Sequence, residues 1–393
     1  MSVRGNIAGD SLELRNLVMT NGALIWLKAL CRSRFDGNDR NVEGNGDGAK
    51  WTEFISMLRN VSWTISNLCR FGRHHKEHII DLVECMAALL LQKEALALDE
   101  RDGSPEGIGA NIGWSFCYLT NDMNSDQSTV PLLEAMIKWK VIESLIALLG
   151  SNNAFTLHSN LRAIGNVLTA NDRYTAHCID CGVLQRLHVL LHQFYAQNVN
   201  HEKLREICWA ISNITAGPTA QVIKVMEAQF VPILMSILSG SRTVIAAEAL
   251  WAVSNATASA SDQIIKYLVD SGIVDGLCAF LRNKFAPNSY HRTANTDKLL
   301  IATFECFDAI LSIDKTLALR VEECGGLDVI EFLQSDQSVS NQIYEFAARL
   351  ITKHFDGAEM NDLVDDDDDQ QLANGAQPGC SWATVAGQPG YKM

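Results

Sequence analysis

Proline and long apolar runs are both scarce in this sequence. Only seven of its 393 residues are proline, and this favours long helices because proline removes a backbone donor and breaks them. Apolar runs such as residues 86–91 are far shorter than the roughly 20 residues of a transmembrane helix. The first residues, Met1 to Arg4, lack the apolar segment of a secretory signal peptide. We therefore expect neither a membrane span nor a secretory signal.

Signatures of catalysis and an excess of basic charge are missing as well. The sequence has no glycine-rich phosphate loop, no nucleophile elbow and no His-Glu-x-x-His motif, so we expect a protein that is not an enzyme and uses no cofactor. The formal net charge is −14. Such a balance disfavours nucleic acid and anionic membranes as partners and favours a basic partner.

The eleven cysteines are scattered and form no disulfide framework. Most lie in apolar stretches, for example Cys69, Cys117 and Cys208, and this is typical of reduced, buried thiols in a cytosolic or nuclear protein. Cys178 and Cys181, with His177 and His188 nearby, could suggest a metal site. No second cysteine pair lies at zinc-finger spacing, so we expect no metal ligand here.

A short phrase that contains Trp and Asn four residues apart recurs along the chain. Its clearest copies run from Trp63 to Asn67, from Trp209 to Asn213 and from Trp251 to Asn255, and variants occur at Asn6, at Trp114 with Tyr118, and at Arg162 with Asn166. Successive Asn or Tyr positions are 61, 51, 48, 47 and 42 residues apart, approaching the period of about 40–47 residues of helical armadillo and HEAT repeats. Positions i and i+4 share one helix face, so each repeat presents an indole beside a carboxamide.

The segments between these phrases follow a common order. A polar turn follows the Trp/Asn helix, a helix comes next and ends near a turn such as Cys181-Gly182, Ser271-Gly272 or Cys324-Gly325, and a further apolar helix follows. Three helices per unit is the armadillo pattern rather than the two-helix HEAT pattern. We expect an all-α chain whose armadillo repeats stack into a right-handed superhelical solenoid.

Composition suggests where the repeats are interrupted and where they end. Residues 34–50 are rich in Gly, Asn and Asp and predict a loop insertion, and further breaks are expected at 99–105 and 286–289. The armadillo array is predicted over residues 1–356. From residue 357 an acidic run, Asp365 to Asp369, and small polar residues predict a disordered tail to residue 393.

The ordered set of phrases resembles the importin alpha family, the adaptors that recognise nuclear localisation signals. The matching segments are residues 5–10, 63–70, 114–120, 161–166, 208–217 and 322–328. The register of the resemblance implies a chain that begins within the third repeat and continues to the tenth. The basic arm that binds importin beta and the first two repeats have no counterpart, so the resemblance supports peptide binding more strongly than coupling to importin beta.

An indole and carboxamide ladder suits an extended basic peptide. Asn offers a donor and an acceptor to peptide main chain of any sequence. Slots between indoles fit the stem of Lys or Arg, whose charge gains about 0.5–2 kcal/mol from cation–π attraction. Carboxylates beside the slots would select basic residues, and the candidates are Asp10, Asp172, Glu206 and Glu248.

The resemblance implies two peptide sites. The larger site is partial and comprises Asn6, Asp10, Asn60, Trp63, Asn67, Asn111, Trp114 and Tyr118, with Asn111 where the family usually places an acid. The smaller site is complete and comprises Arg162, Asn166, Asp172, Glu206, Trp209, Ser212, Asn213, Glu248, Trp251 and Asn255. We expect this second site to supply most of the affinity. Arg162 stands in place of a Trp and separates the two sites, where its cation could pair with a carboxylate.

Several other interpretations stay open at this point. The Trp residues could be core packing, and the Asn residues could bridge adjacent repeats. The function expected from the resemblance is a nuclear import adaptor in cytoplasm and nucleus that binds cargo proteins with Lys/Arg-rich signals, and whose tenth repeat contacts the nuclear export receptor. The rivals are a protein that sequesters cargo without importin beta and a scaffold for acidic or mixed-charge partners.

Overall fold

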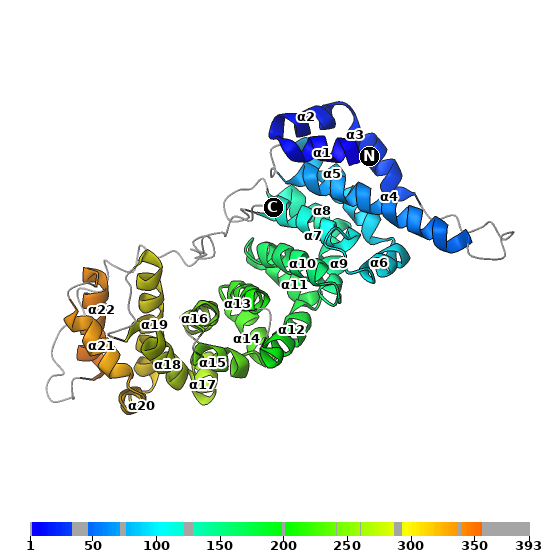
Figure 1. The fold of residues 1–393 in the computed structure, drawn as a ribbon. Helices are drawn as coiled ribbons and strands as arrows, with labels where there is room; N and C mark the ends of the chain where they lie inside the picture. Colours follow the sequence, from blue (N-terminus) through cyan, green and yellow to red (C-terminus); the bar gives the residue numbers. More distant parts are fainter. Residues whose placement is uncertain are drawn as a thin grey trace. The chain divides into compact units, whose positions relative to one another are not determined.

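The computed structural model describes residues 2–33, 46–70, 76–121, 129–198, 201–240, 242–259, 261–286, 293–336 and 339–355. All secondary structure elements in these ranges are helices (Figure 1). The chain forms two compact units, residues 1–186 and residues 187–393. The boundary falls within helix α12 (Val183–Gln197).

The helices of the first unit are closely spaced in sequence, and the longest is α4. Their bounds are α1 (Ser2–Asp10), α2 (Leu12–Thr20), α3 (Ala23–Arg32), α4 (Gly46–Cys69), α5 (Lys76–Leu90), α6 (Lys93–Glu100), α7 (Ile108–Thr120), α8 (Val130–Lys138), α9 (Val141–Leu148), α10 (Ala154–Val167) and α11 (Asp172–Asp180). The helices that carry the Trp/Asn phrase or its variants, which we call third helices, pack in sequence order: α1 on α4, α4 on α7, and α7 on α10.

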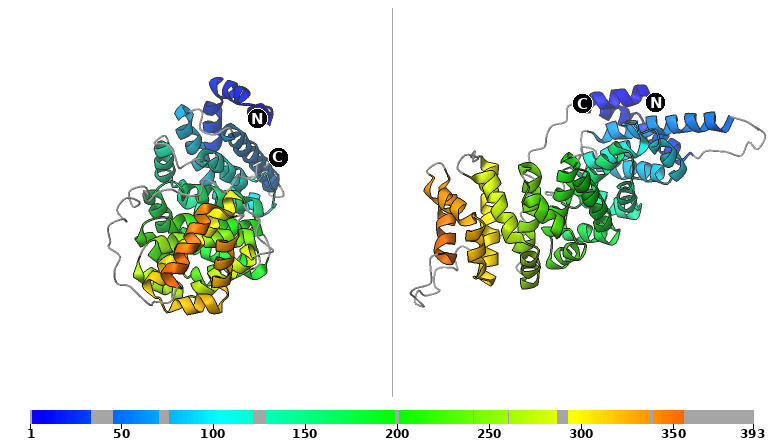
Figure 2. Two further views of the ribbon diagram at one scale, coloured as in Figure 1. Left: turned by 90° about the vertical axis from the view of Figure 1, so that its left-hand side faces the viewer. Right: turned by 60° about the horizontal axis from the view of Figure 1, so that its bottom comes forward.

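The second unit repeats this arrangement. Its helices are α13 (His201–Thr215), α14 (Thr219–Glu227), α15 (Val231–Leu238), α16 (Thr243–Ala258), α17 (Asp262–Asp270), α18 (Ile273–Phe285), α19 (Ala294–Ile313), α20 (Leu317–Glu323), α21 (Gly326–Ser335) and α22 (Asn341–His354). The third helices α13 and α16 again pack in order, and α19 and α22, which follow at the same place in the next two repeats, continue the series. The helices of this unit lie side by side in Figure 2, where they run from green to orange.

Apolar side chains at helical spacing explain why the third helices form and stack. On α13, Ile207, Ile211 and Ile214 are fully buried, and on α4 the same is true of Val61 and Ile65. Each such side chain contributes about 1.5–3 kcal/mol through removal of apolar surface from water. This buried stripe fixes which face of each third helix is left for polar side chains.

The turn between the first and second helix of a repeat confirms the predicted order of elements. Gly182, Gly272 and Gly325 adopt φ values of +88°, +87° and +66°, a left-handed conformation in which glycine carries no steric cost. Gln229 takes the same conformation at φ +62°, at the equivalent point between α14 and α15. A left-handed residue at this position ends the first helix and starts the next one in a new direction.

One expectation from the sequence needs correction. The loop predicted over residues 34–50 is wrong at its end, because α4 begins at Gly46; residues 34–45 lie outside the described ranges. Trp51 packs edge-on against Phe54 at 5.9 Å, a contact one turn apart that supports the helix in this polar sequence. Between α4 and α7 the chain forms two helices, α5 and α6, so this repeat has three helices as predicted, and α6 packs against α4 and α7. The predicted acidic tail also lies outside the described ranges.

No single helix in the described ranges is long and apolar enough to cross a bilayer. Helices α14 and α15 reach the required length and composition only when taken together, and they meet at 88°.

Candidate peptide-binding surface

The Trp and Asn positions of the first unit lie on its third helices, and their exposure differs. Trp63 and Asn67 on α4, Trp114 and Tyr118 on α7, and Arg162 on α10 are half-buried. Asn6 and Asp10 on α1 and Asp172 at the start of α11 are exposed. A core tryptophan would be shielded on all sides, so the indoles of Trp63 and Trp114 retain surface that a ligand can cover.

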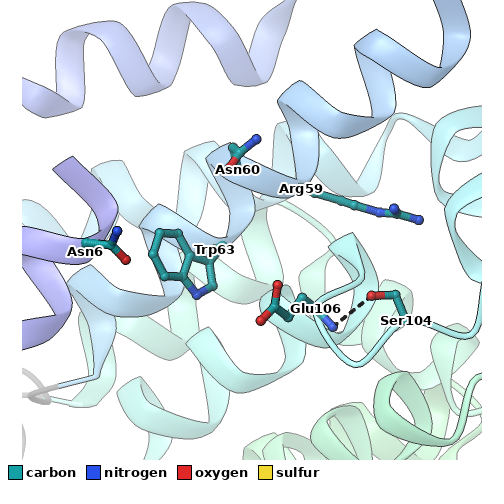
Figure 3. A pocket seen from close by; sticks show the side chains of 6 residues that line it. All are labelled: Asn6, Arg59, Asn60, Trp63, Ser104 and Glu106. Atoms are coloured by element: carbon teal, nitrogen blue, oxygen red, sulfur yellow. Dashed lines mark hydrogen bonds between the residues drawn. The ribbon is translucent and has the colours of Figure 1, made fainter. Parts of the chain in front are cut away.

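A cavity of about 310 Å³ lies beside Trp63. It is lined by Asn6, Arg59, Asn60, Trp63, Ser104 and Glu106 (Figure 3). Asn6, Asn60 and Trp63 are members of the larger site predicted from the sequence. Arg59, Ser104 and Glu106 are not, and the last two come from the turn between α6 and α7, where the sequence predicted only a break over residues 99–105. The cavity therefore combines an indole, carboxamides and groups of both charges.

Arg59 is held away from Trp63 by two carboxylates. Its Nε donates to the buried Asp99, and its Nη2 lies 2.5 Å from Oδ2 of Asp102. These hydrogen bonds raise the pKa of Arg59 above its usual value against the opposing effect of burial. Asp99 also accepts a hydrogen bond from the backbone N–H of Ile108 at 2.6 Å, which ties the start of α7 to the same cluster.

Asn111 occupies a buried position on α7 and is 5% exposed. Its Nδ2 donates to the Ser62 hydroxyl at 3.1 Å and to the carbonyl of Glu106 at 3.0 Å. The side chain of Asn111 thus holds α7 to α4 and to the preceding turn. It does not project into the cavity, whose lining includes Glu106 instead.

Trp114 lies in a cluster of rings. Tyr118 stacks on it with centroids 6.3 Å apart and planes inclined by 27°, and His158 on α10 meets it edge-on at 5.6 Å. Burial raises the pKa of the Tyr118 phenol, so this hydroxyl is neutral and acts as a hydrogen-bonding group at neutral pH. His158 was missed by the sequence analysis, since it lies one turn before Arg162 and outside the repeated phrase.

The second unit brings seven predicted residues together on two packed helices. These are Glu206, Trp209, Ser212 and Asn213 on α13 and Glu248, Trp251 and Asn255 on α16. Both indoles are half-buried, as are Glu248 and Asn255, whereas Glu206 is only 3% exposed. The other three members of the predicted smaller site, Arg162, Asn166 and Asp172, belong to the first unit.

Hydrogen bonds from asparagine join neighbouring third helices in both units. Nδ2 of Asn166 donates to the Cys117 carbonyl and to the Thr120 hydroxyl, each at 3.2 Å. Nδ2 of Asn255 donates to the Ser212 carbonyl at 3.0 Å. The bridging role considered for asparagine is therefore present, and it leaves the carboxamide oxygen of each residue as an acceptor.

The cysteines of the described ranges are free thiols, and most of them are buried. Burial raises the pKa of the Cys178 thiol, so it is protonated at neutral pH. Cys181 Sγ lies 3.5 Å from Nε2 of His177, and this nitrogen lies 4.0 Å from Oε2 of Glu143. His188 instead packs against His192 at 4.3 Å. Of the four residues weighed for a metal from the sequence, His177 and Cys181 lie together, and their ligand atoms and that of Glu143 are all within 4.8 Å of one another.

Comparisons with known proteins agree with the repeat architecture. The family model described as an atypical Arm repeat matches residues 315–373. Importin subunit alpha-4 of Arabidopsis thaliana is 31% identical over 335 residues, which are 81% of this chain and 56% of that protein. Importin subunit alpha-1b of Oryza sativa subsp. japonica is 28% identical over 388 residues, 95% of this chain and 61% of that protein. The chain thus spans little more than half the length of these relatives.

Solved structures show the same fold. An engineered protein has a TM-score of 0.54 and 17% identity, and the match covers 91% of this chain and 94% of that one. A designed armadillo repeat protein in complex with the peptide (KR)4 has a TM-score of 0.51 and 20% identity over 65% of this chain and 98% of that one.

Proposed function

Because the chain is an armadillo-repeat protein related to the importin alpha subunits, we propose that it is a nuclear import adaptor. In this proposal it binds the basic localisation signals of cargo proteins along its Trp/Asn surfaces and works in both cytoplasm and nucleus. The names of the relatives describe transport subunits rather than enzymes. The alternative within the same family is a protein that sequesters cargo without coupling to importin beta.

The arrangement on α13 and α16 carries the proposal. Each helix presents a half-buried indole, Trp209 or Trp251, with a glutamate three residues earlier and an asparagine four residues later. The two helices pack against each other. The same three groups, a glutamate, an indole and a carboxamide, therefore recur on adjacent helices. An extended peptide, whose N–H and C=O groups also recur at regular spacing, could contact both sets.

These groups match the chemistry of an extended Lys/Arg peptide. The methylene stem of a ligand lysine would lie along an indole, while its ammonium gains cation–π attraction and the field of Glu248 and Glu206. The buried position of Glu206 means that it acts through this field rather than through direct contact. The Asn213 and Asn255 carboxamides would pair with the peptide main chain. The net charge of −14 favours encounter with such a ligand.

Calorimetric titration with a peptide that has two Lys/Arg clusters tests this proposal. We expect Trp209→Ala combined with Trp251→Ala to weaken binding by at least tenfold, because two stacking surfaces are removed. Trp26→Ala and Trp139→Ala are matched controls, since both indoles are exposed and lie outside the repeated phrase. Circular dichroism checks that all variants stay helical. Unchanged binding in the double variant would rule out this assignment.

Coupling to the transport machinery is tested separately from cargo binding. A pull-down with importin beta distinguishes an import adaptor from a sequestering protein, because only the adaptor is retained. Retention on the nuclear export receptor tests the role expected of the last repeat, α20 to α22. Variants of the exposed Glu322 and Glu331 in that repeat would identify charge contacts in any complex that forms.

A further inference from the structure

We propose that Glu106 supplies the carboxylate of the Trp63 cavity and selects a Lys or Arg side chain there, and that Asn111 is the residue that positions it. This inference rests on the proposed peptide-binding function. It assigns a specificity role to a turn that lies outside the repeated Trp/Asn phrase.

The residue three positions before each Trp is acidic in the second unit but not on α4 or α7, so a carboxylate near Trp63 must come from another segment. On α13 and α16 this position holds Glu206 and Glu248. On α4 and α7 it holds Asn60 and Asn111. Neither of these carboxamides carries charge, and Asn111 is buried and bonded to other groups. The third helices of the first unit therefore provide no acid at the position that the second unit uses.

Glu106 lies where that missing charge would act. It lines the same cavity as Trp63, Asn6 and Asn60, and Figure 3 shows its carboxylate directed toward Trp63 and the Arg59 guanidinium directed away. The side chain is exposed and thus accessible to a ligand. A volume of about 310 Å³ is at the small end of ligand pockets, which are roughly 300–1,000 Å³, and suits one long side chain.

The backbone of Glu106 is fixed from both sides. Its carbonyl accepts from Nδ2 of Asn111 at 3.0 Å, and its N–H donates to the Ser104 hydroxyl at 3.2 Å. The Ser104 carbonyl in turn accepts from Nδ2 of Asn153 at 3.1 Å. A turn held in this way presents the carboxylate from a preorganised backbone, so binding needs to order only the side chain.

The charge balance around the cavity favours a cation. Among the described residues that line the cavity, Arg59 is the one cationic group, and Asp99 and Asp102 already pair with it. Glu106 adds a third carboxylate to this single guanidinium. A ligand lysine could therefore place its stem along the Trp63 indole and its ammonium at Glu106, with a net gain in charge pairing.

The test compares variants of the full chain with two forms of one probe peptide. The peptide carries two Lys clusters, and in a second series each Lys is replaced by Gln in turn. We expect Glu106→Gln to weaken binding of the parent peptide about two- to tenfold. The preference for Lys over Gln should disappear at one peptide position only. Glu94→Gln changes the net charge equally at an exposed site on α6 and should behave as wild type.

Three further variants distinguish an effect of the charge at residue 106 from an effect on folding. Glu106→Lys should reverse the preference at the same peptide position, so that a peptide with Glu there binds better than one with Lys. Asn111→Ala should lower affinity and reduce the preference without abolishing it, because the turn loosens but Glu106 remains. Rescue by Asn111→Gln, which keeps the carboxamide, would support positioning through the hydrogen bond.

Failure of this inference can be distinguished from failure of the proposed function. If Trp63→Ala weakens binding while Glu106→Gln and Glu106→Lys bind as wild type, Glu106 has no selective role and peptide binding stands. If the wild-type chain binds neither the Lys peptide nor its Gln series, both proposals are wrong.

Discussion

The carboxamide nitrogen of Asn255 donates a hydrogen bond to the main-chain carbonyl of Ser212, 3.0 Å away on the preceding third helix. Asn166 makes the equivalent contact with the Cys117 carbonyl. In both cases the acceptor lies three residues after the position of the repeated Trp, in the last turn of its helix. Asparagine therefore joins consecutive repeats, whatever it also contributes to peptide binding.

This bridging predicts a stability cost when the carboxamide is removed. Asn166 is 8% exposed, so Asn166→Ala removes two buried hydrogen bonds and should cost about 1–3 kcal/mol. Asn255 is half-buried, and Asn255→Ala should cost less. Urea unfolding combined with amide exchange at the end of α7 measures the effect. The control is Asn152→Ala, at an exposed turn residue, which should stay within about 0.5 kcal/mol of wild type. Equal stabilities of the Asn166 and Asn152 variants would contradict this prediction.

The contact between α7 and α10 predicts a second sensitive position at Gly113. A Cβ atom there would lie 2.2 Å from the Ser159 hydroxyl oxygen and 2.9 Å from the backbone nitrogen of Asn160. Backbone atoms cannot move aside without separating the helices, so Gly113→Ala should destabilise the first unit by about 1–3 kcal/mol or more. Thermal unfolding followed by circular dichroism measures the loss.

Gly150→Ala is the matched control for this substitution. The nearest atom to its Cβ is Nη1 of Arg186 at 3.0 Å, the far end of a flexible side chain that can shift. A loss as large as that of Gly113→Ala would show that the cost comes from glycine replacement in general rather than from helix contact.

Asp308 on α19 predicts how the second unit responds to acid. Its Oδ1 lies 2.7 Å from Nε2 of His354 and 2.9 Å from Nζ of Lys353 on α22. Burial raises the pKa of this carboxyl, but the hydrogen bonds from His354 and Lys353 outweigh burial and leave the pKa below its ordinary value. Since the folded pKa is the lower one, this contribution to stability is complete above about pH 4, the unfolded value. It is lost as pH falls from there through the folded pKa.

Asp308→Asn should therefore be less stable than wild type at pH 7 and should lose less stability on acidification below about pH 4. Urea unfolding at several pH values between 3 and 7 measures both effects. Asp328→Asn, at an exposed residue on α21, should follow the wild-type curve. If the free energies of unfolding of wild type and Asp308→Asn fall by the same amount between pH 4 and pH 3, the Asp308 contacts are not a source of acid sensitivity.

Most of the helix order was predictable from sequence because it depends on local patterns. Apolar residues at helical spacing define the buried stripe of α13, and the left-handed turns at Gly182 and Gly272 follow from residue type. The half-buried state of Trp209 and Trp251 also follows, since the stripe fixes which residues flank it.

Long-range contacts explain what the sequence could not predict. Glu106 lines the Trp63 cavity because α7 packs against α4, and Asn111 and Ser104 hold the turn that precedes α7. No spacing rule links position 106 to position 63. One signal was available, namely that Asn111 lacks the charge that Glu206 and Glu248 carry at the corresponding place. The early start of α4 at Gly46 was missed because a glycine- and aspartate-rich segment usually predicts a loop.

Asp99 predicts a link between stability and the charge of the Trp63 cavity. It is 1% exposed, pairs with Arg59 and accepts from the Ile108 N–H. Asp99→Asn removes the buried charge. Its amide NH2 would face either Arg59 Nε or the Ile108 N–H, which are both donors, so the substitution should cost about 2–4 kcal/mol. It also releases the Arg59 cation beside Trp63, so affinity for a Lys-rich peptide should fall at low salt. Asp102→Asn is the control, because Asp102 is 62% exposed and its pairing is worth at most about 1 kcal/mol. Urea unfolding measures the free energy of unfolding of both variants, and calorimetric titration measures their affinity for the peptide. If both quantities are similar in the two variants, Asp99 neither anchors α7 nor restrains Arg59.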